Sequence, residues 1–263
     1  MIISRATPRL KSRAAAAVLA ICLGLVLAAT AFADPNVLWN IVHTKCVPNE
    51  QQHGNPAPCR LVDLSSGEQN GYVVLKDLVG ATQFLLIPTA RVTGIESPLL
   101  LAPGAPNYFA YAWRSRAYVG GILKKTLPRE DVSLAINSVT GRSQNQLHIH
   151  IDCVRGDVRA ILKQAQSIIG DHWGAVGAPL AGHTYLAMKV AGADLDQVNP
   201  FTLLADGVPG ARADMGHHTL VVVGATLSDG RPGFILLDDH TNPAAGDDAS
   251  GEELQDHACA IAK

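Results

Sequence analysis

The sequence lacks two features, and each absence argues against a class of function. Its five cysteines contain no Cys-x-x-Cys pair, so the spacing typical of zinc-binding cysteines is missing. Positive charge is not in excess either. Four of the 21 lysines and arginines lie in residues 1–33, which contain none of the 23 acidic residues, so residues 34–263 carry a net charge of −6. An acidic chain is a poor nonspecific binder of nucleic acid, and any anionic ligand must be held by a local site.

The chain has no convincing internal repeat, and its 263 residues allow one large domain or two small ones. Its long apolar run is N-terminal. An uncharged stretch over residues 14–33 ends in Ala-Phe-Ala and follows four basic residues, Arg5, Arg9, Lys11 and Arg13. This pattern predicts an export signal cleaved after Ala33. The stretch is also long enough to span a bilayer, so an uncleaved membrane anchor is the alternative. Both interpretations export residues 34–263, either into the periplasm or to the periplasmic side of the inner membrane.

Four cysteines lie outside the N-terminal segment: Cys46, Cys59, Cys153 and Cys259. An even number in an oxidising compartment predicts two disulfides, for which three connectivities are possible. We favour the pairing of Cys46 with Cys59, which closes a short loop, and of Cys153 with Cys259.

The hydrophobic periodicity predicts an α+β fold. Strands are expected over residues 71–77 and 83–88, which read as a hairpin, and over 132–137, 146–153, 219–226 and 234–238. Helices are expected over residues 36–46, 106–124, 155–170 and 252–262.

Residues 146–151, with the sequence Gln-Leu-His-Ile-His-Ile, carry the clearest chemical signal. In a β-strand the side chains of Gln146, His148 and His150 share one face with Asp152, while the aliphatic residues fill the core. A neutral imidazole such as His148 can attack phosphorus through a phosphoramidate, and its neighbour can hydrogen-bond the phosphate oxygens. The polar turn over residues 141–145 is a further candidate for phosphate contacts. A lone His-x-His on a strand is, however, more often structural or a metal-binding pair.

The motif at residues 146–151 resembles the His-φ-His-φ-His-φ signature of the histidine-triad (HIT) superfamily. The predicted hairpin before it is similar to the start of that superfamily's nucleoside pocket. Within the superfamily the chain resembles the bacterial CDP-diacylglycerol pyrophosphatases, in blocks at residues 46–49, 56–59, 71–78, 94–100, 132–138, 140–145 and 182–187. The resemblance implies a HIT-like antiparallel sheet with packed helices and a C-terminal α/β extension, all within one domain over residues 34–263.

The same resemblance implies hydrolysis of CDP-diacylglycerol to phosphatidate and CMP, without a metal or an organic cofactor. His148 is the implied nucleophile and His150 the implied phosphate partner. Gln146 replaces the first histidine of the triad; it can orient a phosphate but cannot shuttle a proton. The leaving-group acid is therefore open between His150, Lys76 and a water. The implied substrate-binding residues are Lys76, Asp77, Arg91, Asn137, Ser143, Gln144 and Asn145.

Several assignments keep an alternative at this point. Asp77, implied to hold the ribose, is equally suited to capping the hairpin turn, and Arg91 to being a solvated surface charge. A lipid substrate needs an apolar surface, for which residues 106–118 and 198–215 are candidates, and a membrane surface is the expected partner. Other functions are a hydrolase or nucleotidyltransferase for soluble nucleotide conjugates, or a nonenzymatic nucleotide- or metal-binding module. The sequence assigns no role to His183, His217, His218, His240 and His257, and no oligomeric state.

Overall fold

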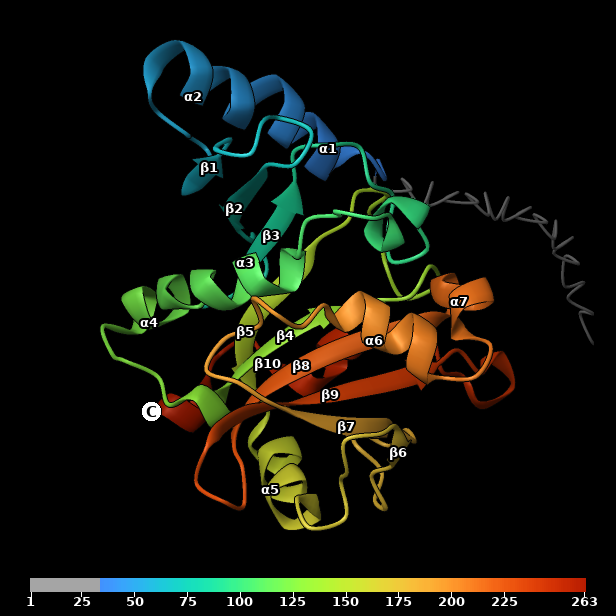
Figure 1. Ribbon diagram of the computed structural model, residues 1–263. Coiled ribbons are helices and arrows are strands. Elements are labelled where there is room, and N and C mark those ends of the chain that lie inside the picture. Colours follow the sequence, from blue (N-terminus) through green and yellow to red (C-terminus); the bar gives the residue numbers. More distant parts are fainter. Residues whose placement is uncertain (1–33) are drawn as a thin grey trace, which may run out of the picture. The chain divides into compact units, whose positions relative to one another are not determined.

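The computed structural model describes residues 34–263, and the predicted export segment lies outside the described residues. Ten strands form one sheet in the order β1-β2-β3-β5-β4-β8-β9-β7-β6, with β10 paired to β5 (Figure 1). All the strand pairs are antiparallel. The strands are β1 (Leu61–Asp63), β2 (Tyr72–Lys76), β3 (Phe84–Pro88), β4 (Val132–Ile136), β5 (Ile149–Val154), β6 (Gly174–Ala175), β7 (Leu186–Ala191), β8 (His218–Thr226), β9 (Pro232–His240) and β10 (Gln255–Asp256).

Helices cover both faces of this sheet. The α-helices are α1 (Val37–Ile41), α2 (Val47–His53), α3 (Tyr108–Ser115), α4 (Ala117–Leu123), α5 (Gly156–Ala165), α6 (Pro200–Gly207) and α7 (Ala211–Asp214). Shorter turns are η1 (Val42–Cys46), which is π-helical, and the 3₁₀ turns η2 (Pro98–Leu101), η3 (Arg129–Asp131), η4 (Met215–His217), η5 (Pro243–Ala245), η6 (Gly251–Leu254) and η7 (Ala260–Ala262). None of the helices within residues 34–263 combines the length and the hydropathy that a membrane span requires.

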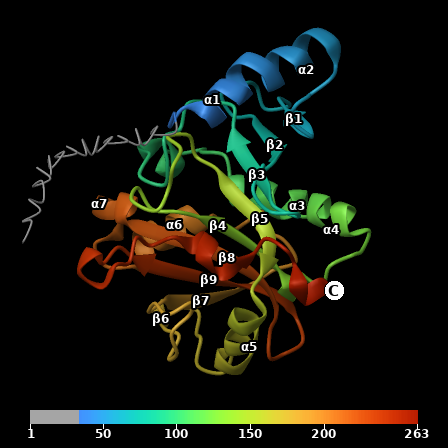
Figure 2. The ribbon, with the colours of Figure 1, turned by 180° about the vertical axis from the view of Figure 1, so that it is seen from behind.

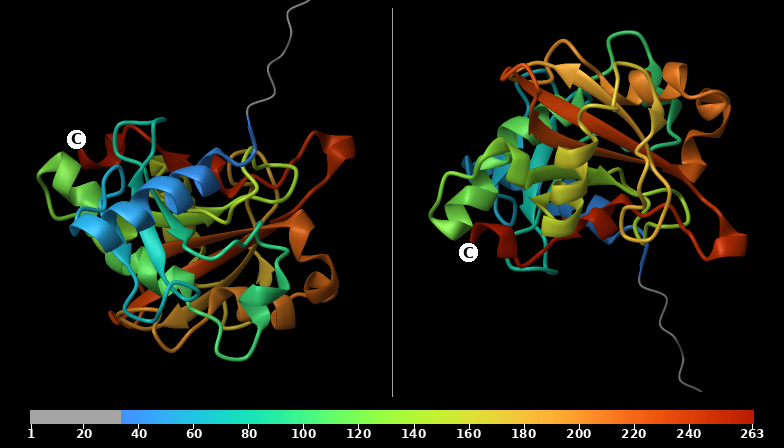
Figure 3. Two further views of the ribbon diagram at one scale, coloured as in Figure 1. Left: turned by 90° about the horizontal axis from the view of Figure 1, so that it is seen from above. Right: turned by 90° about the horizontal axis from the view of Figure 1, so that it is seen from below.

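One face of the sheet carries the main apolar core. Alternate residues of β3, β4, β5, β8 and β9 pack there against α3 and α6. On the opposite face the apolar residues form two separate clusters. One lies under α5 and uses β4, β8 and β9, and the other lies under α1, η1 and α2 and uses β2 and β3 (Figures 2 and 3). This division leaves the middle of that face, at β5, free for polar residues.

The α+β prediction and both predicted disulfides, Cys46–Cys59 and Cys153–Cys259, are confirmed. The C-terminal extension contributes β7, β8 and β9, which continue the same sheet. The predicted closing helix over residues 252–262 is wrong. That segment instead pairs through β10 with Cys153 and Val154 of β5, and the Cys153–Cys259 disulfide secures it beyond the strand.

The largest apolar side chains of the two segments suggested as a lipid groove are buried. Tyr108, Phe109 and Trp113 are each at most 2% exposed, so the aromatic run is core. Phe109 packs against Phe201 of the second segment, with 4.9 Å between ring centroids. The two segments therefore bury their largest apolar side chains against each other, and a lipid groove formed by other residues of these segments stays a prediction.

Candidate active site

The polar row predicted from the sequence lies in the gap between the two apolar clusters. The cross-strand neighbours of His150 on β5 are Leu85 of β3 and Ala135 of β4. Leu85 belongs to the cluster under α1 and α2, and Ala135 to the cluster under α5. Ile149 and Ile151 point to the opposite face and are fully buried in the main core. The alternation predicted for this strand is thus confirmed from Ile149 onward.

The strand begins later than predicted, because β5 starts at Ile149. The Leu147 N–H donates to the carbonyl of Val92 (2.6 Å), which lies outside the sheet. The Gln146 amide donates to the carbonyls of Pro88 (3.0 Å) and Ala90 (2.8 Å). Both amide hydrogens are used by the backbone, so Gln146 fastens this segment to the chain beyond β3. The predicted donation from Gln146 to a phosphate is not available in this arrangement.

His148 is held in one tautomer by its own backbone. Its Nδ1 lies 2.7 Å from the carbonyl oxygen of Gln146, and a carbonyl only accepts hydrogen bonds. The ring proton is therefore on Nδ1, which leaves a lone pair on Nε2. Burial lowers the pKa of His148, so the ring is neutral at neutral pH.

His150 is held in the opposite tautomer. The amide nitrogen of Gln83 lies 2.7 Å from His150 Nδ1 and 2.8 Å from a carboxylate oxygen of Glu252. One amide hydrogen goes to each, so Nδ1 accepts and the ring proton is on Nε2. Burial, and next the adjacent His148, lower the pKa of His150 to about 3. Its Nε2 is buried and has no hydrogen-bond partner among residues 34–263. The two rings, with centroids 4.9 Å apart, thus offer one acceptor and one free donor.

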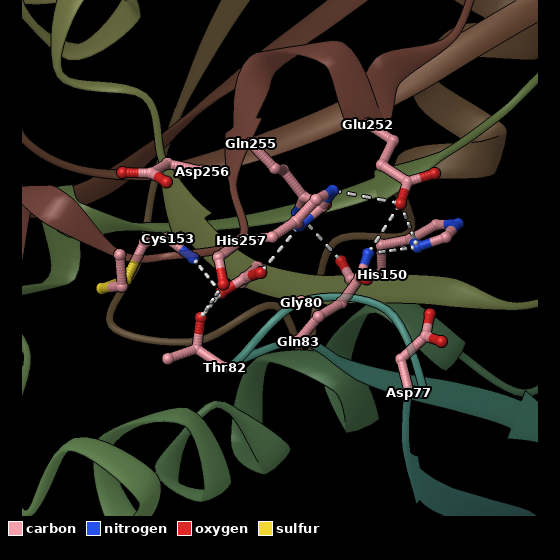
Figure 4. A network of polar contacts seen from close by, with 12 residues as sticks. Asp77, Gly80, Thr82, Gln83, His150, Cys153, Glu252, Gln255, Asp256 and His257 are labelled. Carbon is pink, nitrogen blue, oxygen red and sulfur yellow. Dashed lines mark hydrogen bonds and ion pairs between the residues drawn. A yellow bond between two sulfur atoms is a disulfide. The ribbon is translucent and has the colours of Figure 1, made fainter.

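Glu252 connects the residues around His150 (Figure 4). One oxygen accepts from Gln83 and lies 3.4 Å from His150 Nδ1 and 3.3 Å from His257 Nε2. The other oxygen accepts from the Asn137 amide (3.2 Å). Burial opposes the negative charge, but the hydrogen bonds from His257, Gln83 and Asn137 outweigh it and lower the pKa of Glu252. The carboxylate is therefore ionised.

His257 lies between two carboxylates. Its Nδ1 donates to Asp152 (2.9 Å) and its Nε2 faces Glu252. The same Asp152 accepts from the Thr82 hydroxyl (2.6 Å) and from the Cys153 N–H (2.8 Å). The hydrogen bonds to Asp152 and Glu252 raise the pKa of His257 to about 10. At neutral pH a charged imidazolium thus stands behind the two neutral histidines.

A family model for CDP-diacylglycerol pyrophosphatase matches residues 33–263. The chain belongs to this family. It is therefore a hydrolase of the CDP-diacylglycerol pyrophosphatase type, and the resemblance to that family is confirmed. The polar network at β5 lies within the matched residues.

The stability of this CDP-diacylglycerol pyrophosphatase is expected to depend on pH through His257. Because its pKa in the folded state lies above the ordinary 6.5, the charged ring stabilises the fold fully below pH 6.5. That contribution is lost as the pH rises toward about 10. With the side chain 28% exposed, we expect it to amount to about 2 kcal/mol of the free energy of unfolding. Urea unfolding at pH 6 and pH 9.5, for wild type and His257→Gln, measures it. The variant should lose less stability on alkalinisation, and equal losses in both proteins would contradict the assignment.

Lys76 and Asp77 hold the β2–β3 turn. The Lys76 ammonium donates to the carbonyls of Asp77 (2.8 Å) and Gly80 (2.9 Å). The Asp77 carboxylate accepts from the Val79 N–H (3.0 Å), so the capping alternative for Asp77 is confirmed. Its charge also acts on His148, where it opposes the lowering of the pKa, and a ribose contact from this position stays a prediction.

Four residues predicted to bind substrate make contacts within the protein, and substrate binding by them stays a prediction. Asn137 exchanges hydrogen bonds with Glu252. Gln144 and Asn145 bind the start of the described chain: the Gln144 side chain contacts Leu38 and the Asp34 carbonyl, and the Asn145 N–H donates to the Pro35 carbonyl. Arg91 is exposed, bonds Asn36 and lies over the Trp39 ring, so the surface alternative is the observed one. Ser143 is exposed.

Sequence reasoning missed Arg142, Gln83, Glu252 and the role of His257. Arg142 is clamped by both carboxylate oxygens of Glu96 (2.6 and 2.7 Å), and its charge contributes to lowering the pKa of His148. The sequence did indicate that Asp152 lies at the site, because Asp152 continues the alternation of polar residues at positions 146, 148 and 150. Glu252 and His257 lie about a hundred residues from β5 in a segment predicted to be helical, and the predicted Cys153–Cys259 disulfide was the indication that this segment lies beside the histidine strand.

Proposed function

We propose that this chain hydrolyses CDP-diacylglycerol in two steps through a nucleotidyl intermediate on His148. The observation that carries the proposal is the complementary state of the two rings. His148 offers a lone pair on Nε2, and His150 offers a buried N–H without a partner. A nucleophile and an oxyanion donor held two residues apart are what two-step phosphoryl transfer requires.

In the first step, His148 Nε2 attacks the cytidylyl phosphorus, and the bond from this phosphorus to the bridging oxygen breaks. Phosphatidate leaves with the bridging oxygen and its electron pair. The positive charge that develops on the ring is carried by Nδ1–H, which donates to the Gln146 carbonyl. The His150 Nε2–H donates to a phosphate oxygen on which negative charge accumulates.

The leaving group explains how glutamine can replace the first histidine of the triad. Phosphatidate departs as a phosphate monoester, whose second pKa is about 6, so it leaves at neutral pH without a proton. A general acid is therefore dispensable for this step, and Gln146 serves to position the carbonyl that holds His148. In the second step, water attacks the same phosphorus, the bond to Nε2 breaks, CMP leaves and one proton passes to solvent.

Trapping of the intermediate tests this proposal. Enzyme is mixed with CDP-diacylglycerol that carries a radiolabel in the cytidylyl phosphate and is quenched within one turnover in denaturing alkali. We expect label on wild-type protein that survives alkali and is released by mild acid, as a phosphorus–nitrogen bond requires. His148→Asn should take up none. CMP release by a wild-type enzyme that never becomes labelled would contradict the covalent route while leaving the family's activity intact.

We further propose that the β2–β3 turn contacts the lipid surface. Leu78 is fully exposed and Val79 is 64% exposed, and both follow directly after Asp77 at the site. Two exposed apolar side chains beside the cytidylyl site are suited to inserting into the bilayer that holds the diacylglycerol.

Two disulfides fit an oxidising compartment, and we propose that the enzyme works on the periplasmic side of the inner membrane.

The double substitution Leu78→Ser with Val79→Ser is expected to lower activity about tenfold on long-chain CDP-diacylglycerol in vesicles, because transfer of apolar area to the lipid is lost. Activity on a short-chain, water-soluble analogue should not change. Ile168→Ser is the matched control, because Ile168 is also 64% exposed but lies beyond the end of α5. An equal loss with the soluble analogue, or in the control, would argue against a lipid contact.

A further inference from the structure

A second cluster of ionisable side chains lies away from the histidine motif. His183, Asp239 and Asp247 each place one ligand atom so that all three atoms lie within 4.8 Å of one another. His183 precedes β7, Asp239 is near the end of β9, and Asp247 lies in the loop that follows β9. Three chain segments therefore converge on one point.

The two carboxylates of the cluster are buried, and the nearest described basic group is His183, whose Nδ1 lies 3.5 Å from one Asp247 oxygen. Asp239 and Asp247 are each 6% exposed. One oxygen of Asp239 accepts from the His240 N–H (2.8 Å), and one oxygen of Asp247 accepts from the Ala249 N–H (2.9 Å). The second oxygen of Asp239 is buried and has no hydrogen-bond partner within residues 34–263. Two adjacent buried carboxylates repel each other unless a cation or a shared proton lies between them.

The environment of the cluster also suits a ligand. The Glu253 carboxylate lies 2.9 Å from His183 Nδ1 and accepts from the Tyr185 hydroxyl (2.7 Å), so a third carboxylate adjoins the first two. The His183 side chain is 28% exposed, which gives an ion a route from solvent.

We propose that His183, Asp239 and Asp247 bind one divalent transition-metal cation, and that the donor set favours Zn²⁺. Zinc accepts one imidazole nitrogen with carboxylate oxygens at about 2.0–2.2 Å, which places the donors about 3–4 Å apart. The imidazole disfavours Ca²⁺ and Mg²⁺, which prefer all-oxygen sites. Glu253 is the nearest further donor and either completes the coordination or holds the imidazole in place.

The bound ion would act on the active site through the backbone. It would join the end of β9 to the loop containing Asp247, and that loop leads directly into η6. Glu252, which contacts Gln83, His150 and His257, lies on η6. The ion is therefore assigned a structural role that keeps Glu252 in place, and it does not touch the substrate.

Metal content and metal affinity test this proposal without an activity readout. Untagged protein is analysed for metal by mass spectrometry, and apo-protein is titrated with Zn²⁺ by calorimetry and by thermal unfolding. We expect stoichiometric binding and a Tm that rises with Zn²⁺. The double substitution Asp239→Asn with Asp247→Asn keeps both backbone hydrogen bonds but removes two metal ligands. Loss of a residue that only holds a ligand in place lowers metal affinity roughly 10- to 100-fold, and we expect a larger decrease in Zn²⁺ affinity here.

Two further variants locate the ion. Asp214→Asn removes a carboxylate that binds two other histidines, His217 and His240, and should leave the affinity unchanged. His148→Asn should also leave it unchanged. Loss of binding in either of these variants, with retention in the double variant, would overturn the assignment. A wild-type protein that binds neither Zn²⁺ nor Mn²⁺ stoichiometrically would overturn it too.

Discussion

Substitution of His148 by asparagine is expected to lower kcat/KM for CDP-diacylglycerol by about 10⁴-fold while the protein stays folded, because the nucleophile of a two-step transfer has no substitute. Asparagine is chosen because its amide nitrogen can take the place of Nδ1 and donate to the Gln146 carbonyl, which accepts at 2.7 Å in the wild type. The buried carbonyl then keeps its partner, and only Nε2 is removed. Steady-state release of CMP, with thermal unfolding measured in parallel, gives both quantities.

His172→Ala is the matched control, because the His172 side chain is 92% exposed and should leave both rate and Tm unchanged. A folded His148→Asn protein that retains activity within about a factor of ten of wild type would rule out His148 as the nucleophile. The loss of rate in this variant is independent of the metal site proposed for His183, because the two sites use different side chains.

The alternation of polar and aliphatic residues over 146–151 was enough to predict the position of His150 and the burial of its neighbours. Period-two patterning depends on local chain geometry, which a sequence records directly. The same reasoning extended β5 three residues too far. Gln146 meets backbone carbonyls of residues 88 and 90, and these contacts draw the chain out of the sheet before Ile149. Contacts of this kind have no counterpart in a local pattern.

The substrate-binding residues stay predictions, and the contacts that hold them within the protein could not be read from the sequence. The resemblance to the family implied these residues as substrate contacts, but each of them contacts a part of the chain that is distant in sequence. Asn137 contacts Glu252. Residues 34–39 contact the other three, which are Gln144, Asn145 and Arg91. Conversely, Glu252 and His257 reach the site only because β10 pairs with β5 and Cys259 is bonded to Cys153. The sequence predicted that disulfide, which was the available indication that the C-terminus lies beside the histidine strand.

Glu252→Gln is expected to lower kcat by about 10²-fold with little change in KM, because Glu252 positions His150 and does not touch the substrate. In the wild type its carboxylate takes one hydrogen of the Gln83 amide, which leaves the other for His150 Nδ1. A neutral amide at position 252 no longer fixes which hydrogen of the Gln83 amide goes to His150 Nδ1. It also removes the negative charge of Glu252, which is second to Asp152 in raising the pKa of His257 to about 10. The alkaline limb of the pH–rate profile should therefore move toward neutral pH. Steady-state kinetics from pH 5 to pH 10 measure both effects.

The shift of the alkaline limb distinguishes a role of Glu252 in positioning His150 from a general loss of stability of the fold. A variant that is merely less stable would lose active enzyme at all pH values and keep the wild-type profile. Glu50→Gln on α2 makes the same chemical change outside the polar network at β5 and should alter neither kcat nor the profile. If Glu252→Gln lowers kcat without moving the limb, the charge of His257 does not matter to the reaction, and Glu252 then acts on His150 through the Gln83 hydrogen bond alone.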